Sequence, residues 1–193
     1  MKICHSVEAC TGCTACRHIC PTSAITMREN SEGFLYPEVD EKLCIHCGRC
    51  VRVCPQNHEP VYHEPRAVYA VKHMEQSIRE QSTSGGMFTA LSDWVLRQGG
   101  VIYGAAFDEA FAVSHIAAND ALVRDWMRGS KYVQSSLGDV FAHIKSDLKE
   151  DRYVLFTGTP CQVDGLRNFI EKSHDKLFLV DIVCYGTPSP LLF

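Results

Sequence analysis

The residues with the clearest chemistry are cysteines, and their spacing points to iron–sulfur clusters. The chain of 193 residues has 11 cysteines, and all but Cys161 and Cys184 lie within residues 1–54. Residues 10–21 follow the pattern C-x2-C-x2-C-x3-C-P, and residues 44–55 repeat it. Three thiolates separated by two residues each can wrap a short loop around three corners of a [4Fe–4S] cubane. The fourth cysteine then leaves on a helical turn, and its proline directs the chain away.

Two such runs in one chain are the arrangement with which bacterial-type ferredoxins hold two [4Fe–4S] clusters, and there the fourth cysteine of each run serves the other cluster. Zinc is disfavoured, because zinc sites use paired C-x2-C knuckles without a third cysteine and a trailing proline. A disulfide framework is disfavoured by the odd cysteine count and by the lack of an export signal at the start. We therefore predict two ligand sets: Cys10, Cys13, Cys16 and Cys54 for cluster one, and Cys44, Cys47, Cys50 and Cys20 for cluster two.

The other residues of this segment complete a small repeated module. Apolar residues on both sides of the turn signal at residues 30–33 predict a β-hairpin between the two runs. Because each run already supplies four thiolates, His18 and His46 are predicted to lie outside the ligand sets. Cys4 stands outside the pattern and is predicted to be a spare thiol. The module is assigned to residues 1–60, and the polar stretch that follows, with two prolines, is typical of a linker.

Beyond the linker the chain alternates between strand-like and helix-like patterns. Such alternation predicts an α/β domain at residues 66–193 with a mixed, partly parallel sheet, after an α+β ferredoxin-like dicluster module. The expected strands cover residues 67–71, 101–103, 111–117, 153–156 and 177–184, and the expected helices follow residues 85–86 and cover residues 137–149 and 162–170.

Small hydroxyls and glycines at residues 82–86 precede the first of these helices. Such a helix start exposes backbone N–H groups that suit an anionic group such as a phosphate, although Ser-Gly also makes an ordinary N-cap. The chain has neither a G-x-G-x-x-G fingerprint nor a Walker loop. The residues alone therefore leave cofactor binding at this turn open.

The two remaining cysteines follow predicted strands. Cys161 begins a helix, where the helix dipole favours a thiolate, and Cys184 ends the next strand. If the two strands are parallel neighbours, both thiols lie at the carboxyl edge of the sheet, where α/β proteins bind ligands. From spacing alone they could ligate a further cluster, form a redox pair or be core residues, since buried free cysteine is common.

Several of these stretches together resemble the family of coenzyme F420 hydrogenase/dehydrogenase beta subunits, which are iron–sulfur flavoproteins. The stretches are STSGGMF at residues 82–88, GSKYVQS at 129–135, GTPCQ at 158–162 and VCYG at 183–186. They follow one another in the family's order across residues 66–193. The dicluster module in front resembles the fused form found in some members of the family.

The resemblance implies cofactors for the body of the chain. It implies FAD, and it implies that Cys161 and Cys184 contribute to a third [4Fe–4S] cluster completed by a C-x2-C pair further along. Because that pair is absent, we expect the chain to be a truncated form whose flavin-binding domain is incomplete. The FAD contacts that the resemblance implies are Ser82, Ser84, Gly85, Gly86, Lys131, Tyr132, Gly158 and Thr159.

The expected function is that of an oxidoreductase subunit that passes electrons between a hydride carrier at FAD, such as coenzyme F420, and a redox partner protein through the two clusters. A flavin exchanges two electrons as a hydride, whereas a [4Fe–4S] cluster accepts one. The alternative is a non-enzymatic electron carrier whose incomplete body only docks a partner.

With 19 Lys and Arg against 23 Asp and Glu, the net charge of -4 is not typical of a nucleic-acid binder. No apolar stretch is long enough to span a bilayer, so we expect a cytoplasmic location.

Overall fold

The amino-terminal part of the chain is a β-hairpin with two short helices. The computed structural model describes residues 2–59 and 64–192. In the hairpin turn, the side chain of Asn30 accepts hydrogen bonds from the N–H groups of Glu32 and Phe34, both at 3.0 Å. The two strands pair antiparallel, so the predicted hairpin is confirmed. The elements are α1 (Ala15–Ile19), β1 (Ile25–Glu29), β2 (Leu35–Val39), α2 (Arg49–Val53) and the short 3-10 helix η1 (Pro55–Asn57).

The body is a four-stranded sheet with helices on both faces. The strand order is β4-β3-β5-β6, in which β3 and β4 are antiparallel and the other two pairs are parallel. The predicted mixed, partly parallel sheet is therefore confirmed. The elements are α3 (Gln76–Glu80), α4 (Met87–Arg97), β3 (Val101–Phe107), β4 (Val113–Ala118), α5 (Ala121–Asp125), α6 (Val140–Lys149), β5 (Val154–Gly158), α7 (Pro160–Ile170) and β6 (Leu177–Asp181).

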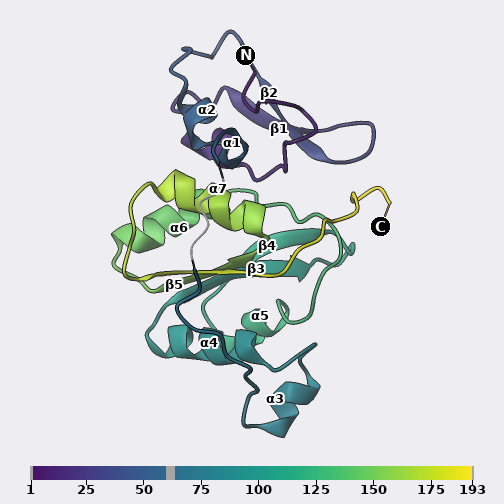
Figure 1. Cartoon of the computed structure of the whole chain (residues 1–193), viewed down its shortest axis with the longest axis vertical. Helices are drawn as coiled ribbons and strands as arrows, with labels where there is room; N and C mark the ends of the chain where they lie inside the picture. Colours follow the sequence, from purple (N-terminus) through teal and green to yellow (C-terminus); the bar gives the residue numbers. More distant parts are fainter. Residues whose placement is uncertain (1, 60–63, 193) are drawn as a thin grey trace.

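Helices cover the sheet in two layers, and the amino-terminal part adds another. Figure 1 shows α6 and α7 on one face of the sheet and α4 and α5 on the other. The amino-terminal part lies on the outer side of α6 and α7, so α7 lies between the cysteine runs and the sheet (Figure 1). None of the helices in the described ranges is long and apolar enough to cross a lipid bilayer.

The amino-terminal part and the body share one hydrophobic core. The cluster of buried side chains that contains Cys13 and Cys16 also contains Phe141, Phe156 and Leu166 from α6, β5 and α7. Leu166 is completely buried in this core. A second buried cluster lies under α4, on the opposite face of the sheet. The two predicted domains therefore pack against each other as one folded unit rather than as modules joined only by a linker.

Two predicted strands differ from the structure. Residues 67–71 form no strand, and Val68 and Tyr69 are 84% and 79% exposed. Strand-forming side chains need a sheet edge to pair with, and this segment instead crosses the turn before α4, where the N–H of His73 donates to the carbonyl of Gly85 at 2.6 Å. The last strand ends at Asp181, so Cys184 lies beyond it.

Candidate metal centres

The two cysteine loops have the same backbone conformation. In the first loop Gly12 and Thr14 have positive φ angles of 66° and 62°, and in the second His46 and Gly48 have positive φ angles of 51° and 71° at the equivalent positions. A β-branched residue such as Thr14 rarely adopts this conformation, so the loop imposes it. Left-handed residues that alternate with right-handed ones turn successive N–H groups inward, which suits an anionic group such as a thiolate-bound cluster.

The first pocket brings together the cysteines predicted for cluster one. Three come from the first run, and Cys54 comes from the end of α2 in the second run. Cys4, the predicted spare thiol, also lines this pocket. The lining residues are Ile3, Cys4, Cys10, Thr11, Gly12, Cys13, Thr14, Cys16, Met27, Pro37, Cys54 and Gln56.

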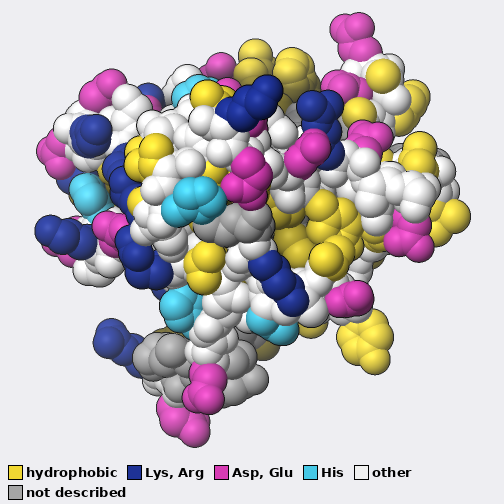
Figure 2. Space-filling model, turned by 90° about the horizontal axis from the view of Figure 1, so that it is seen from above, with side chains coloured by type: hydrophobic (Ala, Val, Ile, Leu, Met, Phe, Trp, Pro, Cys, Tyr) yellow, Lys and Arg dark blue, Asp and Glu magenta, His cyan; other side chains and the backbone are white. Residues whose placement is uncertain are grey.

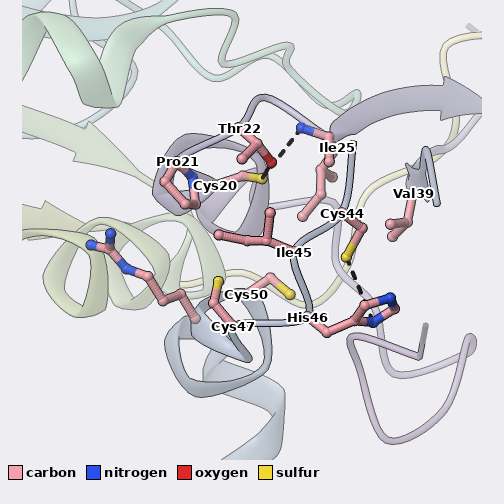
Figure 3. A pocket seen from close by; sticks show the side chains of 12 residues that line it. Cys20, Pro21, Thr22, Ile25, Val39, Cys44, Ile45, His46, Cys47 and Cys50 are labelled. Atoms are coloured by element: carbon pink, nitrogen blue, oxygen red, sulfur yellow. Dashed lines mark hydrogen bonds between the residues drawn. The ribbon is translucent and has the colours of Figure 1, made fainter. Parts of the chain in front are cut away.

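The second pocket brings together the cysteines predicted for cluster two. Figure 3 shows Cys20, from the end of the first run, near the loop that carries Cys44, Cys47 and Cys50, with Ile45 between them in this view. Each pocket thus brings together three cysteines of one run and the fourth cysteine of the other run, as the predicted ligand sets require.

Burial controls the acidity of the thiols in the first pocket. It raises the pKa of Cys13 to about 12 and that of Cys54 to about 11, and it raises the pKa of Cys10 and of Cys16 as well. Without a metal these thiols are protonated at neutral pH, so cluster assembly must release protons. In the second pocket burial also acts to raise the pKa of Cys20, but N–H groups of residues 22–24 outweigh it and lower the pKa.

Unpaired hydroxyl groups in the first pocket fit a bound cluster. The side-chain oxygens of Thr11 and Thr14 are buried, and neither has a hydrogen-bond partner among the described residues. Buried hydroxyls are rarely left unsatisfied, and both residues line the pocket. A [4Fe–4S] cluster would offer them sulfur acceptors. Four thiols and two unused donors therefore fit the cluster predicted for this pocket.

Helix α7 of the body packs directly against the first cysteine run. A Cβ atom at Gly165 would lie only 3.0 Å from the Sγ of Cys13, so the absence of a side chain permits this approach. The side-chain amide of Asn168 donates to the carbonyl of Val53 at 3.1 Å. On α6, Asp139 at the helix start pairs with Arg17 at 2.8 Å. The first pocket therefore lies against the body.

The two histidines inside the cysteine runs have different surroundings. The ring of His18 packs against Phe141 and Phe169, with ring centroids 5.2 and 5.8 Å away. Burial lowers the pKa of His18 to about 4, so the ring is neutral at pH 7. His46 is exposed, and its Nδ1 lies 4.0 Å from the Sγ of Cys44. His46, which lines the second pocket, and Glu41 thus lie next to Cys44.

The two cysteines of the body lie after neighbouring parallel strands. β5 and β6 are parallel neighbours, which is the condition for both thiols to reach one edge of the sheet. Cys161 is the second residue of α7, three residues after the end of β5. Burial and, more weakly, the nearby thiol of Cys161 raise the pKa of Cys13. Cys161 is therefore close to the first pocket. Cys184 is exposed three residues beyond the end of β6.

Part of the predicted flavin site forms one local surface. The turn at residues 82–86 lies beside Gly129, where a Cβ atom would be 3.7 Å from the Oγ1 of Thr83. Gly86 is the N-cap of α4, and among the described residues no side chain caps that helix start. The ammonium of Lys131 donates to three backbone carbonyls at 2.8–3.1 Å, and Tyr132 is 74% exposed. Lys131 therefore shapes the loop.

The other predicted flavin contacts have a structural role at the start of α7. Thr159 and Gln162 form a capping box, in which Thr159 N–H donates to the side-chain oxygen of Gln162 at 3.0 Å. Gly158 lies beside the same glutamine side chain. The structure thus places Gly158 and Thr159 at the start of α7, which covers the face of the sheet opposite α4. The T-x-x-Q spacing was a sequence signal for this cap.

A buried hydrogen-bond chain behind this cap was not predicted. His115 Nε2 donates to the carbonyl of Thr157 at 3.0 Å, so its Nδ1 accepts from the hydroxyl of Ser135 at 3.1 Å. Ser135 in turn accepts from the amide of Gln162 at 2.9 Å. These hydrogen bonds connect the 129–136 segment to the start of α7. No spacing rule links His115 to these residues, because the sheet brings them together.

His115 should make the stability of the protein sensitive to acid. Burial lowers the pKa of His115 from 6.5 to about 4. Between pH 6.5 and 4, the histidine is therefore protonated in the unfolded chain and neutral in the folded chain, which favours unfolding. Stability is therefore full above pH 6.5 and decreases below it. We expect the wild type to lose about 1 kcal/mol more unfolding free energy between pH 7.5 and 5.5 than His115→Gln, measured by urea unfolding. The same pH dependence of the unfolding free energy in the wild type and in His115→Gln would contradict a neutral His115 in the folded protein.

Comparisons with known proteins agree with both halves of this description. Residues 9–58 match the model of a 4Fe-4S dicluster domain, and a second model with that description matches residues 36–89. Residues 151–193 match the model for the C terminus of the beta subunit in coenzyme F420 hydrogenase/dehydrogenase.

Curated relatives and a solved structure extend the likeness. The F subunit of the F(420)H(2) dehydrogenase of Methanosarcina mazei is 22% identical over 182 residues, which are 90% of this chain and 52% of that protein. The coenzyme F420-dependent sulfite reductase of Methanocaldococcus jannaschii is 27% identical over 161 residues, 82% of this chain and 24% of that protein. A chain of the F420-reducing [NiFe] hydrogenase complex from Methanosarcina barkeri has a TM-score of 0.50 at 20% identity, over 62% of this chain and 44% of that chain.

These findings show that the chain is similar to iron–sulfur oxidoreductase subunits. They confirm the resemblance drawn from the sequence, in which a 4Fe-4S dicluster module is joined to a region of the family of coenzyme F420 hydrogenase/dehydrogenase beta subunits. The chain spans about half the length of the first of these relatives and about a quarter of the second.

Proposed function

We propose that this chain passes electrons between a hydride carrier of the coenzyme F420 type, which reacts at FAD in the body, and a redox partner protein, through two [4Fe–4S] clusters. The observation that carries the proposal is the pair of pockets, each with the crossed set of four cysteines. FAD exchanges a hydride as an electron pair and the clusters accept electrons singly, so the combination joins a two-electron donor to a one-electron partner.

The packing supports an order for the two cluster sites. The first pocket lies against α7, with Gly165 and Cys161 of the body close to Cys13. The second pocket is lined only by residues 20–50 and includes the exposed side chains of Cys47 and Ile45. Cluster one therefore connects to the body, and cluster two faces the partner.

The surface around the amino-terminal part suits a protein partner. Positive and negative side chains are interspersed over this face, and apolar side chains gather in several places between them (Figure 2). Leu43 and Ile45, beside the second pocket, are 50% and 62% exposed. Exposed apolar side chains with a polar rim are typical of protein interaction sites.

The experiment that tests this function is anaerobic reduction of the reconstituted chain, loaded with FAD, by reduced coenzyme F420. Loss of the visible absorption of the clusters on addition of the reduced carrier is the expected result. Dithionite serves as the control, because it reduces the clusters without a flavin. Clusters that respond to dithionite and stay oxidised with the reduced carrier would contradict the proposed function.

A second candidate function, that of a simple electron carrier, is favoured by one observation. Within the part of the chain that the structure describes, both pockets are lined only by residues of the amino-terminal part, so the clusters need no ligand from the body. In that case the body would dock a partner and bind no flavin. Bound FAD distinguishes the two functions.

The turn before α4 provides a specific test of flavin binding. We expect Ser84→Leu to reduce FAD occupancy several-fold, because Ser84 stands in the turn that opens α4 and a branched apolar side chain would cover the N–H groups there. Ser31→Leu, in the exposed hairpin turn, is the matched control and should leave occupancy unchanged. FAD is released from each purified variant and quantified. Unchanged occupancy in Ser84→Leu would remove this turn from the flavin site.

A further inference from the structure

The first pocket contains one cysteine more than a cubane requires. Cys4 lines it together with the four predicted ligands, and its side chain is buried at 8% exposure. The second pocket has no fifth cysteine among its lining residues, and Ile25 and Val39 contribute apolar side chains to its wall. The two halves of the repeated module therefore differ in this thiol.

The amino-terminal segment is held in place so that Cys4 stays in the pocket. The side chain of Asn57 donates to the carbonyl of Ile3 at 2.8 Å and accepts from the N–H of His5 at 3.0 Å. The same amide donates to the carbonyl of Val51 in α2 at 2.9 Å. One side chain thus fixes both neighbours of Cys4 to α2, whose C-cap is Cys54.

The Asn57 side chain also places Cys4 near one particular ligand, Cys54. Asn57 is the last residue of η1, which begins directly after Cys54. The residues on both sides of Cys4 are therefore bound to a residue three positions after Cys54. Cys4 and Cys54 both line the first pocket. Cys13, by contrast, faces α7 on the side of Gly165.

We propose that Cys4 is an alternative to Cys54 as the fourth ligand of cluster one. The inference rests on the proposed cluster sites and goes beyond them, because it gives the first site a reserve thiol that the second site lacks. The exchange involves no change in oxidation state. Cys4 loses its proton to solvent as its sulfur binds iron, and the Cys54 thiolate that leaves the iron takes up a proton.

The test compares two equivalent cysteines, the fourth of each run. In the full chain, reconstituted anaerobically, the wild type should bind about eight irons, and Cys54→Ala should keep about eight because Cys4 takes over. Cys20→Ala, the matched control in the pocket without a fifth thiol, should fall to about four. The double variant Cys4→Ala/Cys54→Ala should also fall to about four, whereas Cys4→Ala alone should keep about eight.

Iron and sulfide are measured per chain, and the reduced clusters are followed by electron paramagnetic resonance. A fall to about four irons in Cys54→Ala, equal to that in Cys20→Ala, would overturn the inference while the wild-type value still supports two clusters. If Cys54→Ala is recovered only as aggregate, the midpoint potentials of Cys4→Ala decide. A shifted midpoint potential at one cluster supports the inference, because contacts to the ligand sulfurs influence the potential of a cluster. Unchanged potentials at both clusters would overturn the inference.

Discussion

Cys13→Ala is expected to remove about half of the bound iron and to leave the second cluster in place. Cys13 lines the first pocket and not the second. It is buried, with 9% exposure, and packs against Gly165 of α7, whereas Asn57 holds the segment that carries Cys4. Cys161, the second residue of α7, is also close to Cys13, but its Sγ lies at 3.1 Å from the hydroxyl of Thr159. Iron analysis and resonance spectra of the reduced protein measure the loss.

Cys47→Ala is the matched variant at the equivalent position of the second run. It should also remove about half of the iron, but the cluster that remains should be the buried one next to α7. The spectra of the two variants should therefore differ from each other, and together account for that of the wild type. Loss of all iron in either variant would contradict two separate cluster sites.

Gly165→Leu is expected to lower the unfolding free energy by about 2–3 kcal/mol and to weaken cluster one. A Cβ atom at Gly165 already lies 3.0 Å from the Sγ and 3.1 Å from the Cβ of Cys13. The larger side chain must push α7 away from the first cysteine loop, because the surrounding core is closely packed. Denaturant unfolding gives the stability, and the iron content gives the cluster occupancy.

Arg167→Leu, two residues further along α7, is the control for this helix. The Arg167 side chain is 62% exposed, and its ion pair with Asp164 is a surface contact of the kind that contributes little. This variant should keep both clusters and nearly all of the stability. A Gly165→Leu protein as stable as the control, with its full iron content, would contradict the close packing of α7 on the first pocket.

The cysteine chemistry was accessible from the sequence because it is local. The spacing within each run determines the loop conformation, and the repeat of the run predicts the crossed ligands that the pockets bring together. The alternation of strands and helices in the body was likewise visible, because each element is short and has its own period. The predicted strand at residues 67–71 was wrong, since its strand-forming side chains find no sheet edge.

Contacts across the fold were not accessible from the sequence. Nothing in the sequence around Gly165 indicates that a cysteine loop will pack on it. The position of His115 between Ser135 and Thr157 depends on how β4 and β5 are placed in the sheet. Cys4, predicted as a spare thiol, enters the first pocket because Asn57 draws the amino-terminal segment onto α2. These contacts depend on packing between segments that are distant in the sequence, and rules on residue spacing do not predict such packing.

Flavin-linked electron transfer is best tested by the anaerobic absorption spectrum of the purified chain after cluster reconstitution with excess FAD, with iron and released flavin quantified in the same sample. We expect a broad cluster band, about eight irons and about one FAD per chain. The same cluster band and iron content without any retained flavin would contradict the flavin-linked function and leave an electron carrier.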